Sequence, residues 1–173
     1  MAKKIKGSRR ISLTAMMMAL SVLALYLAAV LPTGRVTLYV LSSLFFAPLA
    51  YEREMGLAVL GFVGASLLGL LIVPNKVQIL PYVLFFGHYG LGKYLLERIR
   101  SKPLSIFLKL VYFNVCMLLI YLLAREVLFA EITLPLSPWL IVVLAQPAFI
   151  LLDFAYSLAL DIYFKTIHKR LIR

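Results

Sequence analysis

Residues 3–31 read KKIKGSRRISLTAMMMALSVLALYLAAVL, a basic flank followed by a largely apolar run. The run occupies residues 11–31. Its length of about 20 residues is what a helix needs to cross the hydrocarbon core of a bilayer, and it exceeds the apolar core of a typical signal peptide. We therefore interpret the stretch as a retained first transmembrane helix.

The rest of the chain has the same apolar character. Hydrophobic residues make up 64% of the 173 positions, whereas apolar residues form about half of an ordinary soluble domain. The formal net charge of +11 would suggest a nucleic-acid partner for a soluble protein. Here the charges lie at the ends of apolar segments, where they meet anionic lipid headgroups, and we expect no nucleic-acid partner. The single cysteine, Cys116, lies within an apolar run and predicts a buried side chain without a disulfide.

Five further apolar segments follow the first, separated by proline, glycine and charged residues that favour turns. The second segment is short and contains Pro48, so we expect a tilted, irregular or partly re-entrant helix there. Glycines in the third and fourth segments predict close packing of neighbouring backbones. The predicted fold class is all-α, a single-domain integral membrane bundle of six transmembrane helices. The helices are expected at residues 11–31, 36–51, 55–73, 78–96, 104–123 and 139–164.

The basic residues are distributed unevenly among the gaps between these segments. Fifteen of the 18 Lys and Arg residues lie before the first segment, after the last, or around the second and fourth gaps. They are Lys3, Lys4, Lys6, Arg9, Arg10, Arg53, Lys93, Arg98, Arg100, Lys102, Lys109, Lys165, Lys169, Arg170 and Arg173. The intervening gaps hold only Arg35, Lys76 and Arg125. Because cytoplasmic loops collect Lys and Arg, this pattern predicts that both termini are cytoplasmic.

Polar side chains deep within apolar segments are costly, and each is therefore a candidate for function. The residues of this kind are His88, Asn114, Gln146 and Asp153. At 1.5 Å per helical residue, His88 and Asp153 lie about 15 Å and about 18 Å from the inner ends of their helices. They predict either an outward-facing ligand pocket, in which Asn114 and Gln146 orient a ligand bound by Asp153, or a packing contact between Asp153 and His88.

Two further charged residues lie about one turn inside the inner ends of the fourth and sixth segments. They are Lys93 and Asp161. Their similar depth and opposite charges predict a structural ion pair between these two helices.

The sequence contains no recognisable catalytic or metal-binding pattern. His88 and His168 lack the spacing of metal ligands, and Ser42 and Ser43 have no histidine or acid nearby in sequence to activate them. A nucleotide-binding motif is also missing, so the chain is not expected to drive transport with ATP alone. We expect a protein that is not an enzyme and that uses neither a metal nor another cofactor.

Four of the alanines within the first predicted helix are regularly spaced along it. Ala15 and Ala19 are four residues apart, and Ala24 and Ala28 repeat that spacing. Residues four apart share a face of a helix, so the alanines predict a smooth strip against which another helix packs at short range. That helix belongs either to a partner or to the same bundle.

The basic N-terminus, the sequence SLTAMMMAL at residues 12–20 and six predicted spans in a short chain resemble the substrate-binding S component of an energy-coupling factor (ECF) transporter. The resemblance implies a subunit in a prokaryotic cell membrane that binds a vitamin or related micronutrient from outside. It also implies docking to a transmembrane coupling protein joined to two ATPase subunits, and inward delivery of the ligand by toppling of the whole S component. The docking face would contain Ala15 and Ala19, extended by Ala24 and Ala28.

The same resemblance implies a ligand pocket in the outer half of the bundle. Depth and polarity select its residues, because the family has no shared ligand motif. The candidates are Tyr82, His88, Asn114, Tyr121, Gln146 and Asp153, with the loop near Arg35 or the one near Asn75 and Lys76 closing over them. The alternative is a non-transporting membrane scaffold resembling the MreD cell-shape family, in which the alanines and polar residues serve packing.

Overall fold

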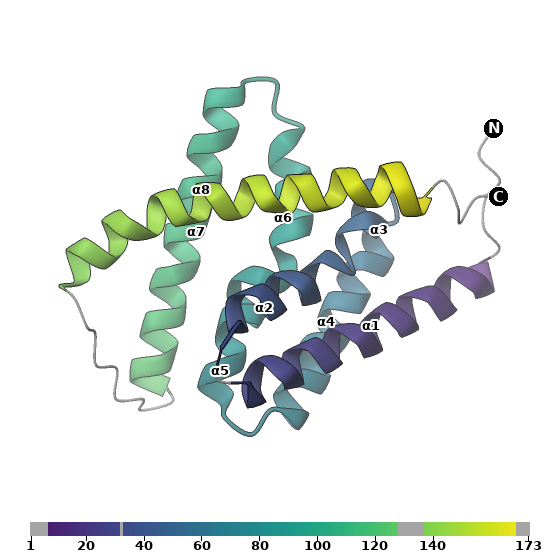
Figure 1. Cartoon of the computed structure of the whole chain (residues 1–173), viewed down its shortest axis with the longest axis horizontal. Coiled ribbons are helices and arrows are strands. Elements are labelled where there is room, and N and C mark those ends of the chain that lie inside the picture. Colours follow the sequence, from purple (N-terminus) through teal and green to yellow (C-terminus); the bar gives the residue numbers. More distant parts are fainter. Residues whose placement is uncertain (1–6, 32, 128–136, 169–173) are drawn as a thin grey trace.

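The computed structural model describes residues 7–31, 33–127 and 137–168 (Figure 1). Within these ranges the chain is helical and contains no β-strand, which confirms the all-α prediction for the described part. The α-helices are α1 (Gly7–Val30), α2 (Arg35–Leu44), α3 (Ala47–Tyr51), α4 (Met55–Ile72), α5 (Lys76–Pro81), α6 (Gly87–Glu97), α7 (Lys102–Leu122) and α8 (Pro138–Ile162). Three π-helical turns extend them: η1 (Tyr82–Phe86), η2 (Leu123–Val127) and η3 (Tyr163–His168).

Four helical segments are long and apolar enough to cross a membrane. They are Ile11–Val30, Met55–Ile72, Lys102–Glu126 and Leu140–Lys165. Their outer faces expose large apolar side chains, and Leu151 and Phe154 of α8 are each 70% exposed. An apolar exterior of this kind is unusual for a soluble protein and suits contact with lipid. The count of six spans and the cytoplasmic position of both termini stay predictions.

The second predicted segment is broken. Helix α2 ends at Leu44, a turn occupies residues 45–46, and α3 begins at Ala47. Pro48 lies in the first turn of α3, where a missing backbone N–H breaks no helical hydrogen bond. The prediction of an irregular second helix is therefore confirmed.

The fourth predicted segment is continuous helix over residues 76–97, formed by α5, η1 and α6. Its polar residues, among them His88 and Lys93, make it less apolar than the four candidate spans. These polar residues are tolerated because the segment is central in the fold. Helix α6 contacts α2, α3, α4 and α7, and its residues Tyr89, Gly90 and Lys93 are buried. This segment contacts protein on most sides, so its polar groups find partners.

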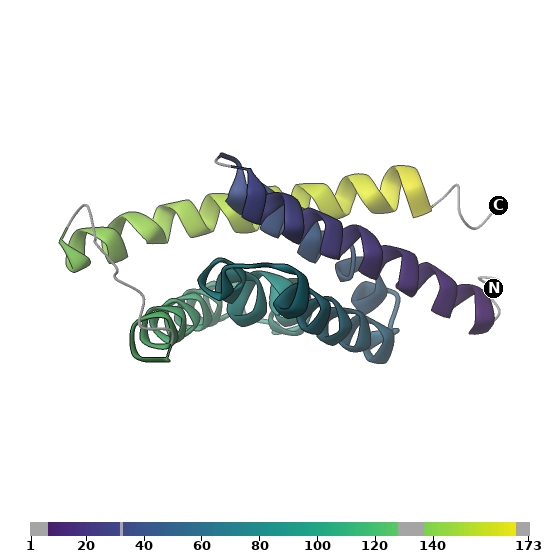
Figure 2. The same ribbon diagram turned by 90° about the horizontal axis from the view of Figure 1, so that it is seen from below.

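The helices lie in two layers that cross. Figure 2 shows α4, α6 and α7 in one layer and α1 and α8 in the other. Helix α8 runs across α6 and α7 (Figure 1), whereas a bundle of six spans predicts helices that are close to parallel. The crossing brings the middle of α8 into contact with α6 and α7 together.

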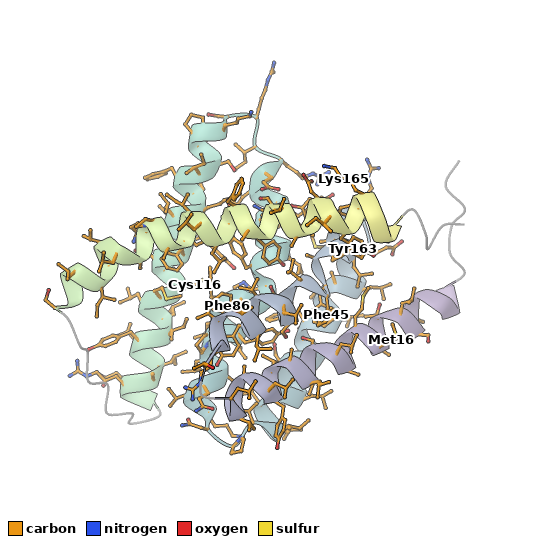
Figure 3. The ribbon with its side chains drawn as sticks, viewed as in Figure 1. Met16, Phe45, Phe86, Cys116, Tyr163 and Lys165 are labelled. Carbon is orange, nitrogen blue, oxygen red and sulfur yellow. The ribbon has the colours of Figure 1, made fainter. Side chains whose placement is uncertain are left out.

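Aromatic side chains fill the space between the layers. Phe113 of α7 and Phe149 of α8 stack with ring centroids 4.6 Å apart, and Phe85 packs edge-on against Phe113 at 5.4 Å. Cys116 is buried beside them, as predicted, and Figure 3 places it among the packed helices. Close helix packing is confirmed at Gly61 of α4, where a Cβ atom would lie 2.6 Å from Cδ1 of Phe46.

Candidate functional site

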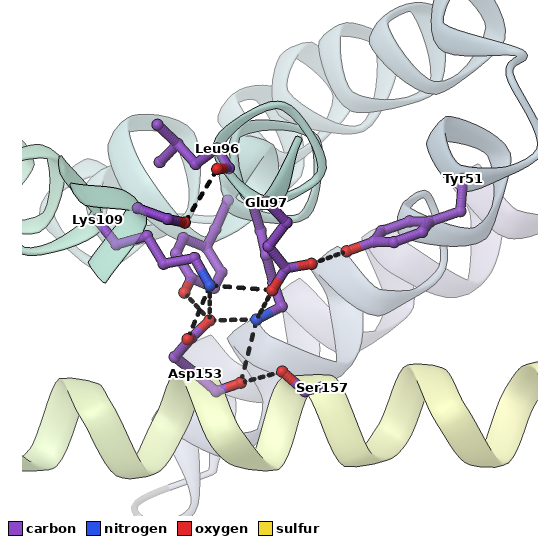
Figure 4. A network of polar contacts seen from close by, with 9 residues as sticks. Tyr51, Leu96, Glu97, Lys109, Asp153 and Ser157 are labelled. Atoms are coloured by element: carbon purple, nitrogen blue, oxygen red, sulfur yellow. Dashed lines mark hydrogen bonds and ion pairs between the residues drawn. The ribbon is translucent and has the colours of Figure 1, made fainter. Parts of the chain in front are cut away.

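Four charged residues meet where α8 crosses α6 and α7 (Figure 4). We call Lys93, Glu97, Lys109 and Asp153 the charge cluster. Nζ of Lys109 lies 2.9 Å from Oδ2 of Asp153 and 3.0 Å from Oε1 of Glu97. Nζ of Lys93 lies 2.8 Å from the same Glu97 oxygen and also contacts Oδ1 of Asp153. Two ammonium groups and two carboxylates thus neutralise one another.

Hydroxyl groups complete the cluster. Tyr89 donates a hydrogen bond of 2.5 Å to Oδ1 of Asp153, and Tyr51 donates one of 2.7 Å to Oε2 of Glu97. Ser157 donates to the backbone carbonyl of Asp153 at 2.9 Å. Both carboxylates therefore accept hydrogen bonds from charged and neutral donors, which is the condition under which buried ions are tolerated.

The two sides of the charge cluster differ in exposure. The Lys93 and Lys109 side chains are 1% and 7% exposed, whereas those of Asp153 and Glu97 are 22% and 37% exposed. Glu97 is the last residue of α6. Its carboxylate is held by Lys93, Lys109 and the hydroxyl of Tyr51. The two carboxylates thus form the more exposed side of the charge cluster, and the two lysines form the enclosed side.

Asn114 and Gln146, both predicted ligand residues, form a reciprocal amide pair between α7 and α8. Nδ2 of Asn114 donates to Oε1 of Gln146 at 3.1 Å, and Nε2 of Gln146 donates to Oδ1 of Asn114 at 3.0 Å. Each amide also donates to a backbone carbonyl of its own helix, Leu110 at 2.7 Å and Val142 at 2.9 Å. The amide donors are occupied within the chain, as the packing alternative predicts.

A double-mutant cycle measures this pair. Asn114→Leu and Gln146→Leu are each expected to lower the free energy of unfolding, since each leaves one amide without its partner in an apolar contact. The double variant is expected to recover about 1 kcal/mol relative to the sum of the single losses. Unfolding in mixed detergent micelles gives the three values. Strictly additive losses would show that the pair contributes no coupling.

His88 and Tyr82 lie in two other contacts. Nδ1 of His88 on α6 is hydrogen-bonded to the hydroxyl of Tyr112 on α7. The fully buried hydroxyl of Tyr82 lies 3.2 Å from Oγ of Ser21, which lies 2.5 Å from Oγ of Ser42. These contacts join helices, and His88 does not pair with Asp153 as the packing alternative expected.

Tyr121 is the remaining predicted ligand residue. It is partly exposed on α7, and its hydroxyl accepts a hydrogen bond of 3.4 Å from Arg125. The six candidates therefore make five separate sets of contacts within the chain, and their grouping in one ligand pocket stays a prediction. Helical depth places residues at one level without specifying which face they occupy, and these residues face different neighbours.

The predicted ion pair between Lys93 and Asp161 is also wrong. Asp161 lies on the exposed side of α8, 3.8 Å from Lys165, and Lys93 pairs with Asp153 and Glu97 instead. Lys109 and Glu97 were not predicted as part of a site. The position of Lys109, several residues inside an apolar helix, could have predicted the charge cluster, because a charge at that depth requires a partner of opposite charge.

The four alanines of α1 that were predicted to form the docking face separate into two pairs. Ala15 and Ala19 are exposed, whereas Ala24 and Ala28 are 5% and 0% exposed within the core. Nine residues separate Ala15 from Ala24, which is about two and a half turns and places the pairs on opposite sides of the helix. The expected extension of the docking face to Ala24 and Ala28 is therefore wrong, and these two residues pack within the chain.

Two surface hollows have no residue of the charge cluster in their linings. One, of about 520 Å³, is lined by residues 74–77 at the turn between α4 and α5, where a loop was expected to close over a ligand. The other is a groove of about 410 Å³ between α6 and α7, lined by apolar side chains and Tyr112. Asp153, Asn114 and Gln146 line neither of these two hollows.

Fold and site together define an all-helical protein with an apolar, membrane-compatible exterior and a neutralised charge cluster between its helices. No protein-family model, curated protein or solved structure matches the chain. The residues of the chain itself are therefore the basis for inferring its function.

Proposed function

We propose that the chain is the substrate-binding subunit of a membrane importer of the ECF type, located in a prokaryotic cell membrane. It captures a vitamin or related micronutrient from outside and delivers it inward with a transmembrane coupling protein and two ATPase subunits. The proposal includes six membrane crossings with both termini in the cytoplasm.

The observation that carries this proposal is the exposed pair Ala15 and Ala19 on α1. Two alanines one turn apart leave a flat strip where the backbone of another helix approaches closely. Ala24 and Ala28 pack inside the chain, whereas Ala15 and Ala19 are exposed, so this strip is available to a partner helix.

The charge cluster supports a ligand site. Replacing a buried ion pair by apolar residues of similar volume is often neutral or stabilising, so Lys93, Lys109 and Asp153 are not the simplest way to pack three helices. Ionisable groups within apolar segments are functional candidates by default. A hydrogen-bond donor or cationic group on the ligand would compete with Lys93 and Lys109 for the carboxylate of Asp153. This carboxylate is partly exposed and contacts both lysines.

Docking is tested by enlarging the strip. Ala15→Trp and Ala19→Trp are each expected to abolish co-purification with the coupling protein and ATPases while leaving the thermal stability of the isolated chain unchanged. Ala155→Trp, at an exposed alanine of α8, is the matched control and is expected to keep the association. Equal association of all three variants would rule out docking through α1.

Ligand binding is tested on the purified chain with a panel of micronutrients. A true ligand at a hundredfold excess over its Kd is expected to stabilise the protein by about 2.7 kcal/mol, seen as a rise in melting temperature. A panel that shifts nothing removes the support for a transport role.

A membrane scaffold resembling the MreD family is the second candidate. The reciprocal pair of Asn114 and Gln146 favours it, because these amides serve helix packing. A scaffold predicts no micronutrient-dependent stabilisation and no association with ATPases, so the two experiments above separate the candidates.

A further inference from the structure

The groove between α6 and α7 has an apolar floor and walls. Leu96, Leu108, Val111 and Val115 line it, together with Gly92 and Tyr112. The hydroxyl of Tyr112 is hydrogen-bonded to His88, so this polar group is already satisfied. From residue 108 to residue 115 the groove follows α7 for about 10 Å, at 1.5 Å per residue. Its shape and chemistry suit a segment of an acyl chain.

Gly92 gives the groove its depth. A Cβ atom at this position would lie 3.6 Å from the ring of Tyr112, an ordinary van der Waals contact. A larger side chain at position 92 would therefore project into the groove without disturbing the packed helices. A single substitution at position 92 can therefore fill the groove.

One end of the groove meets a basic turn. Leu96 and Leu108 line that end, and the α6–α7 turn beside it carries the exposed residues Arg98, Arg100 and Lys102. The turn is tied to the helices because Ser105 donates a hydrogen bond of 2.9 Å to the carbonyl of Leu96. No acidic residue occurs between positions 98 and 112, and the preceding Glu97 is occupied by the charge cluster. An apolar channel thus opens beside three cations.

We propose that this groove binds an anionic phospholipid of the bilayer, with an acyl chain between α6 and α7 and the phosphate at Arg98, Arg100 and Lys102. Basic residues next to a membrane helix attract anionic headgroups, and the cytoplasmic leaflet is the anionic one in which this turn is predicted to lie. The apolar channel adds a chain contact that a basic loop alone does not provide. The inference rests on the proposed orientation of the chain in the membrane but not on a transport role.

Native mass spectrometry of the detergent-purified full chain tests the site with phosphatidylglycerol and phosphatidylcholine of identical acyl chains. The wild type is expected to bind phosphatidylglycerol more tightly. R98Q/R100Q/K102Q is expected to weaken phosphatidylglycerol binding on the order of a hundredfold. Gly92→Leu is expected to weaken it about tenfold, equivalent to losing two buried methylene contacts.

Matched controls are available for both changes. Gly56→Leu places the same side chain at an exposed glycine of α4 with no atom near its Cβ, and R35Q/R125Q/K165Q removes three exposed cations elsewhere. Both are expected to bind phosphatidylglycerol like the wild type. If Gly92→Leu fails to fold, Val115→Phe fills the groove from its exposed wall and decides the result.

Three results would overturn the proposal. Equal affinity for phosphatidylglycerol and phosphatidylcholine would show that the basic turn does not recognise an anionic headgroup. If folded Gly92→Leu or Val115→Phe binds phosphatidylglycerol as tightly as the wild type, the acyl chain does not occupy the groove and binding is only charge attraction at the surface. Equal weakening by the control cations shows that net charge rather than this turn attracts the lipid.

Discussion

Asp153→Asn is expected to lower the free energy of unfolding by about 3–5 kcal/mol, the range for removing one partner of a buried ion pair. The reason is the enclosure of Lys93 and Lys109, whose side chains are 1% and 7% exposed. Without the aspartate, both ammonium groups depend on Glu97 alone, and the hydroxyl of Tyr89 loses its carboxylate acceptor. Unfolding by sodium dodecyl sulfate in mixed micelles measures the change.

Asp161→Asn provides a control on the same helix. Asp161 is exposed and lies 3.8 Å from Lys165, so its removal is expected to change stability by less than about 0.5 kcal/mol. The quadruple variant K93M/E97Q/K109M/D153L removes all four charges together and keeps at position 97 an amide oxygen that accepts from Tyr51. It is expected to regain most of the stability, because the unpaired charges are gone.

This comparison also bears on the proposed ligand site. A large loss of stability in Asp153→Asn shows that Asp153 holds α8 to α6 and α7, and this structural role is compatible with a ligand role. Micronutrient affinity of the folded variant tests the ligand role separately, and an affinity equal to that of the wild type would remove Asp153 from the ligand site. Equal small losses in Asp153→Asn and Asp161→Asn would contradict the expected energetic importance of the charge cluster.

Helical class, an irregular second helix and close packing at glycine follow from local patterns. Periodic apolar content, Pro48 and Gly61 each act within one or two turns of helix, so neighbouring residues are enough to predict them. Contacts between helices depend on which face each residue occupies. His88 and Lys93 are five residues apart, about 140° around α6, and therefore face Tyr112 and Asp153 respectively. Depth along the helix correctly indicated that these polar residues lie inside the helical segments, but it assigned their contact partners incorrectly.

For the basic residues, too, position along the chain must be distinguished from the contacts that the side chain makes. Lys93 and Lys109 were assigned to a cytoplasmic gap, but both are buried and paired with carboxylates. The other thirteen basic residues at the alternate gaps still exceed the three at the intervening gaps. The predicted orientation therefore does not depend on the two lysines. What changes is their role, from topogenic charges to members of the charge cluster.

Gly90→Val is the second substitution with a large expected effect. Gly90 lies on α6 at the meeting point of α3 and α8. A Cβ atom there would lie 2.9 Å from Cβ of Ala47 and would overlap the hydroxyl of Tyr156. Tyr156 is enclosed, packs edge-on against Tyr89 at 5.4 Å and accepts a hydrogen bond from Ser43. Because neither neighbour has room to retreat, we expect a loss of about 3 kcal/mol or more in the free energy of unfolding.

The pair Gly90→Ala and Gly92→Ala isolates this steric effect. Both changes add one methyl group to α6 and gain up to about 1 kcal/mol of helix propensity. At position 92 the nearest atoms are 3.6 Å away, so Gly92→Ala is expected to raise the melting temperature and Gly90→Ala to lower it. Equal shifts would show that α3 and α8 do not approach α6 at Gly90. Tyr156 lies one turn after Asp153 on α8, so a displaced α8 also disturbs the charge cluster, and the losses from Gly90→Val and Asp153→Asn are expected to be less than additive.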